Sequence, residues 1–162
     1  MIKTIDRLLT DSELKYLLSK CEQFVKNNET MPDGKNWFYN SMHLWDDENL
    51  MNLRLRLIDF VGDKYEIQYN GIFINKVIPQ TNTNDGFHRD SSDLSIVMFL
   101  NDDFTGGEFE YYETPTTLVK IQPSIDKSVL LNTEVLHRVL PIHSGERYTL
   151  IVWFKLAKKS LV

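Results

Sequence analysis

The spacing of apolar residues along this chain changes once, near Tyr65. Over residues 14–25 and 50–61 apolar positions recur every three or four residues, as they do along one face of an α-helix. After Tyr65 they tend to alternate with polar positions, which is typical of strands with one buried face. The pattern therefore predicts two helices followed by a long β-rich region.

The first predicted helix begins with a capping box, in which Thr10 caps the helix and Glu13 follows three residues later. The second begins near Asp46 or Asp47 and ends at Gly62. Each helix has one apolar face, and these faces should pack against one outer sheet through Leu14, Leu17, Phe24, Leu53 and Leu57. The sole cysteine, Cys21, lies on the apolar face of the first helix and is interpreted as a core residue, not a nucleophile.

Asn70-Gly71 indicates a hairpin between strands at 66–69 and 72–78. Residues 141–145 are expected to form a turn. Further strand-like segments lie at 94–100, 108–113, 117–121, 128–131, 134–140 and 148–154. Short strands without interleaved helices favour a mainly β fold with N-terminal helices, either a sandwich or a jelly roll.

The chain has 162 residues, of which 42% are apolar, and this predicts a single domain over 1–162. Its parts would be a helical brace at 1–62 and a jelly-roll core at 63–156. No run of 18 apolar residues predicts a transmembrane helix, and the N-terminal residues lack the pattern of a signal peptide. With one cysteine, a cytoplasmic location is expected. The oligomeric state is left open.

The net charge of −5 argues against a nucleic-acid partner, because such proteins normally carry a basic face. Residues 84–113 hold eight acidic side chains and one base. A solvated edge is the ordinary interpretation of such an acidic stretch, and a cation-binding site near Asp90 is the more specific, functional interpretation.

The candidate chemistry begins with His88 and Asp90, which are two residues apart and can face the same side of an extended chain. His137 lies on a later strand-like segment. Two imidazoles and a carboxylate on a rigid β framework suit Fe(II), with open positions for other ligands. Zn²⁺ could use the same three residues, so the triad alone does not identify the metal.

Arg147 begins the last strand-like segment, and Thr149, Ile151 and Trp153 would share its face. A cation buried on this apolar face requires a paired anion, and a guanidinium prefers a carboxylate. An ordinary surface arginine at the start of a strand is the alternative. With the triad nearby, we favour an anchor for an anionic cosubstrate.

Four linked pieces of sequence now point to a known family. They are His88-x-Asp90, the segment at 100–108, His137-x-Val139, and Arg147-Tyr148 leading to Val152-Trp153-Phe154. In order and spacing they resemble the Fe(II)- and 2-oxoglutarate-dependent dioxygenases, specifically the prolyl 4-hydroxylase-like branch. The resemblance covers roughly residues 72–154.

The resemblance implies a double-stranded β-helix, which is a cupin-like jelly roll, braced by the two helices. His88, Asp90 and His137 would bind Fe(II), and Arg147 would pair with the distal carboxylate of 2-oxoglutarate. O₂ would be the second cosubstrate, with ascorbate as a candidate reductant. The implied chemistry hydroxylates an unactivated C–H bond and releases succinate and CO₂. Trp153, Val139, Phe99, Val97 and Ile151 are the candidate pocket-lining residues.

The chain also departs from the family pattern. Phe99 stands where many relatives place a tyrosine hydroxyl beside the arginine, and Thr149 could supply a hydroxyl instead. Relatives often carry another tyrosine before the first histidine, where this chain has Ile78 and Pro79. Asn75 is the candidate polar substitute there.

The resemblance makes a prolyl residue in a peptide or protein the expected substrate. Hydroxylation of a free amino acid or small metabolite is an alternative. A jelly-roll module that binds a metal or ligand without catalysis is another, and the triad with Arg147 argues against it. No nucleic-acid or membrane partner is expected.

Overall fold

Two helices and a series of antiparallel strands make up the computed structural model, which describes residues 2–27, 41–44, 46–62, 65–79, 86–125 and 127–158. The helices are α1 (Asp11–Asn27) and α2 (Met51–Val61), and a short 3₁₀ helix, η2 (Glu48–Leu50), leads into α2. The strands are β1 (Ile2–Asp6), β2 (Ser41–His43), β3 (Tyr65–Val77), β4 (Leu94–Phe99), β5 (Thr105–Gly106), β6 (Phe109–Thr114), β7 (Thr117–Ile121), β8 (Lys127–Asn132), β9 (His137–Val139), β10 (Ile142–Ser144) and β11 (Arg147–Lys158).

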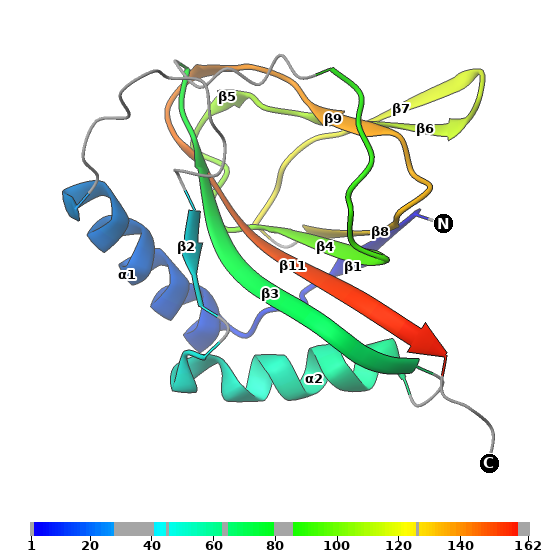
Figure 1. Ribbon diagram of the computed structural model, residues 1–162. Helices are drawn as coiled ribbons and strands as arrows, with labels where there is room; N and C mark the ends of the chain where they lie inside the picture. Colours follow the sequence, from blue (N-terminus) through cyan, green and yellow to red (C-terminus); the bar gives the residue numbers. More distant parts are fainter. Residues whose placement is uncertain are drawn as a thin grey trace.

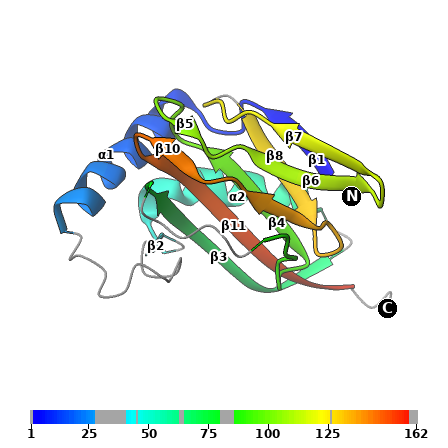
Figure 2. The same cartoon turned by 90° about the horizontal axis from the view of Figure 1, so that it is seen from above.

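The strands form two layers, with the helices outside one of them. The main sheet has the order β1-β8-β4-β11-β3-β2, and the facing layer consists of the smaller sheets β10-β5 and β7-β6-β9. Figure 1 shows α1 and α2 against the outer face of the main sheet, and Figure 2 shows the smaller sheets lying over it. The predicted fold class, a jelly roll braced by two helices, is confirmed.

The helices are held to the main sheet by an apolar cluster on its outer face. Leu17, Leu53 and Leu57 are fully buried there, and Leu14 packs against the cluster from its edge. The fifth predicted contact, the side chain of Phe24, lies outside the described residues. Helix–sheet packing of this kind stabilises helices more than their intrinsic propensity does. Within the described residues, the helices are too short or too polar to cross a membrane.

The predicted capping box is present at the start of α1. The backbone N–H of Glu13 donates to Oγ1 of Thr10, and the N–H of Thr10 donates to the Glu13 carboxylate. Burial alone would raise the pKa of Glu13, but hydrogen bonds from Arg56 and Thr10 outweigh it and lower the pKa below its ordinary value. The carboxylate therefore links α1 to α2, because Arg56 lies on α2 and contacts it at 2.6 Å.

A second apolar cluster fills the space between the two layers. Strand β4 contributes to both apolar clusters, because Val97 and Phe99 face this interior while Ile96 and Met98 face the helices. Phe109 and Val139 meet them from the smaller sheet. The alternation of side chains along each strand thus gives the main sheet two apolar faces, and the inner one leads to the site described below.

The hairpin predicted at Asn70-Gly71 is wrong, because this dipeptide lies in the middle of β3. Strand β11 pairs with β3 along nearly its whole length, with Asn70 opposite Phe154 and Gly71 opposite Trp153. Gly71 is buried in this ladder. The continuous backbone hydrogen bonding to β11 outweighs the local turn preference of the dipeptide.

Three further segments differ from the sequence-based expectation. The expected turn at 141–145 contains β10, which pairs with β5, and only Gly145 has the positive φ of a turn. The strand expected at 134–140 is limited to β9. Strand β1 was not expected in the helical part, yet it pairs with β8 at the edge of the main sheet. Its apolar residues Ile2 and Ile5 are three positions apart and pack into different clusters, so they give no alternating signal.

Cys21 lies in the outer cluster, as its position on the helical stripe predicts. Only 3% of the residue is exposed. Burial raises the pKa of the thiol to about 12. At neutral pH the sulfur is therefore protonated and serves as part of the core.

The capping box generates a stability prediction. We expect Thr10→Ala to lower the free energy of unfolding by about 1 kcal/mol, because it removes the side-chain acceptor for the Glu13 N–H. Urea denaturation followed by circular dichroism measures this change. Thr116→Ala, at the exposed turn between β6 and β7, is the control and should stay within about 0.5 kcal/mol of the parent protein. Equal effects of the two substitutions would contradict a specific role for the cap.

Candidate active site

The structure brings His88, Asp90 and His137 together at the inner face of the jelly roll. The backbones of His88 and His137 form an antiparallel bridge, with N–H···O distances of 2.9 Å in both directions. This bridge sets the two rings side by side, with centroids 4.5 Å apart. One candidate ligand atom from each of the three residues lies within 4.8 Å of the others. The spacing suits a single metal ion held by two imidazoles and one carboxylate.

The ring of His137 is held by its neighbours. It is 4% exposed, and Phe109 stacks on its ring at 5.2 Å. Its Nδ1 lies 3.0 Å from the carbonyl oxygen of Val135, so a proton on Nδ1 leaves Nε2 available on the side of Asp90, whose Oδ1 is 3.7 Å away. Burial lowers the pKa of His137, and this favours the neutral imidazole that binds metals.

Asp90 has hydroxyl groups behind it that the sequence analysis did not identify. Ser95 donates a hydrogen bond to Oδ2 of Asp90, and Ser92 lies within hydrogen-bonding distance of Ser95. Both serines are buried, and Ser95 interrupts the apolar sequence of β4. Such an isolated buried serine is the only sequence signal that could have suggested the contact.

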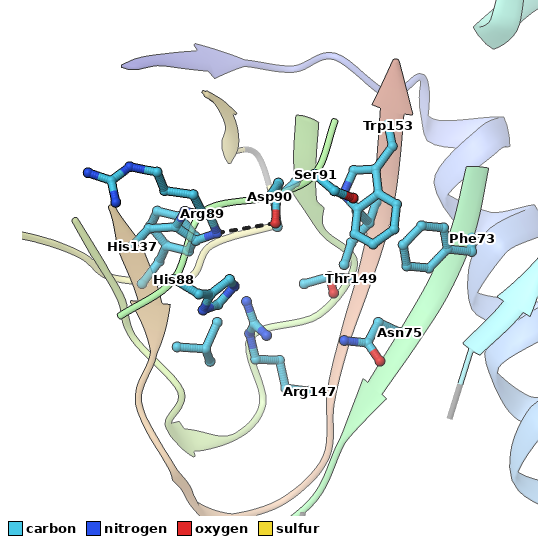
Figure 3. A pocket seen from close by; sticks show the side chains of 14 residues that line it. Phe73, Asn75, His88, Arg89, Asp90, Ser91, His137, Arg147, Thr149 and Trp153 are labelled. Carbon is cyan, nitrogen blue, oxygen red and sulfur yellow. Dashed lines mark ion pairs between the residues drawn. The ribbon is translucent and has the colours of Figure 1, made fainter. Parts of the chain in front are cut away.

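A cavity of about 370 Å³ opens beside the three ligands, as the close view in Figure 3 shows. The predicted residues Asn75, Val139, Arg147, Thr149 and Trp153 line it. Phe99 does not, because it lies in the inner apolar cluster beneath the cavity. The remaining lining residues are Phe73, His88, Arg89, Asp90, Ser91, Val97, Phe109, His137 and Ile151, of which Phe73, Arg89, Ser91 and Phe109 were not predicted.

Arg147 is a buried cation in this cavity. It is 2% exposed, and its Nε finds no hydrogen-bond partner among the described residues. Burial lowers the pKa of the guanidinium to about 10, which still leaves it positive at neutral pH. The ring of Phe99 lies 5.3 Å from its central carbon. A buried charge without a paired anion is costly, so the site suits a ligand that carries a carboxylate.

The loop before β6 explains how the arginine is enclosed. Gly107 has φ +69°, and a Cβ at this position would lie 2.3 Å from Cδ1 of Ile142 and 3.1 Å from Cδ of Arg147. Only glycine therefore allows the β5–β10 ladder to pack this closely over Arg147.

Two further polar side chains, Thr149 and Asn75, lie near Arg147 and are opposite each other in the main sheet. Thr149 on β11 is opposite Asn75 on β3 and opposite Phe99 on β4. Both Thr149 Oγ1 and Asn75 Oδ1 are buried and have no hydrogen-bond partner within the described part of the chain. In Figure 3 the side chains of Arg147, Thr149 and Asn75 converge on the same part of the cavity. A hydroxyl and a guanidinium can donate to one carboxylate, so these groups suit an anionic ligand.

The fold and the donor set together define a jelly-roll scaffold with a candidate metal site of two histidines and an aspartate beside a cationic pocket. Residues 77–155 match the 2OG-Fe(II) oxygenase superfamily. This match covers just under half of the chain and agrees with the resemblance that its motifs predict.

Relatives and solved structures agree with this similarity. The human 2-oxoglutarate and iron-dependent oxygenase domain-containing protein 2 is 29% identical over 51% of this chain, which spans 25% of that relative. A prolyl 4-hydroxylase structure from Phytophthora capsici has a TM-score of 0.69 at 19% identity and covers 96% of this chain and 59% of its own. A prolyl hydroxylase from Trichoplax adhaerens, in complex with a hypoxia inducible factor peptide, has a TM-score of 0.69 at 16% identity, covering 95% and 83%. The chain thus shares the fold of solved prolyl hydroxylase structures.

Asp90→Ala should abolish Fe(II) binding, because it removes the carboxylate from the three candidate ligands and leaves only the two imidazoles. Anaerobic isothermal titration calorimetry measures the loss. Asp93→Ala is a control outside the ligand set, since Asp93 bonds to the backbone of β11 instead. Normal Fe(II) affinity in Asp90→Ala would contradict the assignment of this residue as a ligand.

Arg147→Ala should weaken 2-oxoglutarate binding by orders of magnitude, and Thr149→Val by about tenfold, or roughly 1.4 kcal/mol. The valine keeps the shape of threonine and removes only the hydroxyl. Calorimetric titration with 2-oxoglutarate measures both effects.

An unchanged dissociation constant in Thr149→Val would show that another group contacts the carboxylate. Phe99→Tyr in the Thr149→Val background should partly restore binding, because residue 99 lies directly opposite residue 149 in the sheet.

Proposed function

We propose that this protein is an Fe(II)- and 2-oxoglutarate-dependent dioxygenase that hydroxylates a prolyl residue in a peptide or protein. The observation that carries the proposal is the buried Arg147, unpaired within the described residues and lining the same cavity as His88, Asp90 and His137. Metal ligands and a cationic anchor in one cavity suit a cosubstrate with a carboxylate at each end.

In this proposal His88, Asp90 and His137 would hold the iron, and Arg147 and Thr149 would hold the distal carboxylate of 2-oxoglutarate. Bound Fe(II) would supply the activation of O₂, so that R–H, O₂ and 2-oxoglutarate give R–OH, succinate and CO₂. One oxygen atom enters the product and the other enters succinate. Ascorbate is proposed as the reductant that keeps the iron in its Fe(II) form.

The chain's own side chains also shape the reaction space. Val97, Phe109, Val139 and Ile151 line the cavity and give part of its wall an apolar surface. Phe73 and Trp153 form an edge-to-face pair on another wall, with ring centroids 4.9 Å apart. Packed aromatic rings give a rigid apolar surface on which the ring of a prolyl residue can lie.

The fold of the prolyl hydroxylases supports the choice of a prolyl substrate, and the peptide complex of one of them supports a peptide. Because this chain spans only a quarter of the human relative, the activity and substrate of the whole protein are proposals. Hydroxylation of a free amino acid or a small metabolite is the alternative that the substrate test must separate.

The test is a panel of proline-containing peptides together with free proline, incubated with Fe(II), 2-oxoglutarate and ascorbate in air. We expect succinate release that depends on a peptide, together with the gain of one oxygen atom on proline by mass spectrometry. Arg147→Ala is the matched inactive control. Oxygen gain on free proline alone would select the small-molecule alternative, and 2-oxoglutarate binding without turnover of any panel member would contradict the prolyl substrate.

A further inference from the structure

Two buried serines behind Asp90 are not explained by the packing of the core. Ser95 is 1% exposed and Ser92 is 4% exposed. Ser95 lies in the centre of the main sheet, between Trp153 on β11 and Leu131 on β8. A hydroxyl in such a position is costly unless it makes hydrogen bonds. The contacts of Ser95 therefore indicate what this residue does.

The hydrogen bonds of the two serines run in one direction. Ser95 Oγ donates to Oδ2 of Asp90, and the two serine oxygens are 2.6 Å apart. A serine hydroxyl has one proton, and that of Ser95 is already used on the carboxylate. Ser92 must therefore donate to Ser95, so the two successive hydrogen bonds end at Oδ2 of Asp90.

The rest of the segment around Asp90 is also fixed, but through its backbone. The carbonyl oxygen of Asp90 accepts from Thr133 at 3.2 Å. Three residues later the N–H of Asp93 donates to the carbonyl of Phe154 at 2.8 Å. These contacts place the main chain and leave the rotation of the carboxylate to be set by Ser95.

We propose that Ser95, supported by Ser92, is a positioning residue that occupies Oδ2 of Asp90 so that only Oδ1 is presented to the metal. This inference rests on the proposed function, because it assigns a role around the same metal site. Oδ1 lies on the side of His137, 3.7 Å from its Nε2. A carboxylate can bind a metal through one or both oxygens. By holding Oδ2, Ser95 keeps a coordination position available for the cosubstrate.

The decisive comparison is Ser95→Thr against Ser95→Val in the full chain. These two residues have the same shape and differ in the hydroxyl alone, so any packing effect is common to both. Anaerobic calorimetry with Fe(II) should show Ser95→Val binding about 10- to 100-fold more weakly than Ser95→Thr, the range found when the partner of a metal ligand is lost. Equal affinities in the pair would overturn the proposal.

The supporting role of Ser92 is tested by combining substitutions. Ser92→Ala should weaken Fe(II) binding less than Ser95→Ala does. The double variant should bind like Ser95→Ala, because Ser92 acts only through Ser95. The control is Ser128→Ala. Ser128 is an equally buried serine on β8 that takes no part in the hydrogen bonds of Ser92, Ser95 and Asp90, so this variant should bind Fe(II) normally. Additive losses from Ser92 and Ser95 would contradict the one-directional arrangement.

A spectroscopic measurement separates positioning from a general loss of stability. Co(II) bound in place of Fe(II) should give a visible absorption spectrum that changes in shape in Ser95→Val and is unchanged in Ser95→Thr and Ser128→Ala. An identical spectrum in Ser95→Val would mean that the carboxylate binds as before, and the proposal would fail. If the parent protein binds neither metal, the proposed function itself fails. Normal metal binding in the parent together with no effect of the Ser95 substitutions would instead overturn only the role of Ser95.

Discussion

The buried positive charge of Arg147 is the constraint on which the interior of this jelly roll depends. Strand β11 lies in the middle of the main sheet, so its first residue projects into the space between the two layers. Gly107 and Ile142 close over the side chain, and Phe99 lies beneath it. Since no carboxylate among the described residues pairs with this charge, an anion bound beside Arg147 would stabilise the folded state as well as complete the site.

Much of the fold could be predicted because its signals are local. The change from helical to alternating spacing near Tyr65 marks where the strands begin, and the Thr10–Glu13 capping box marks the start of α1. The residues of the candidate site could be predicted for a related reason. Residues two apart on an extended chain share a side, so His88 could be grouped with Asp90, and Arg147 with Thr149.

The features that escaped prediction depend on contacts between distant segments. Asn70-Gly71 has the sequence of a turn, and only its pairing with Phe154 and Trp153 on β11 makes it a strand. The bond from Ser95 to Asp90 is equally hidden, because a single serine in an apolar strand does not indicate which side chain it contacts. The exclusion of Phe99 from the cavity also required the packing of the inner cluster, where its ring lies beneath Arg147.

The burial of Cys21 has a consequence for chemistry elsewhere in the molecule. Mixtures of iron, oxygen and a reductant generate oxidants that attack exposed thiolates. The sole cysteine of this chain lies on the buried face of α1, and its raised pKa keeps the sulfur in the thiol form. The described fold therefore keeps its only thiol in the outer cluster, apart from the cavity beside the candidate metal site, and this burial protects the protein from thiol oxidation and disulfide-linked dimers.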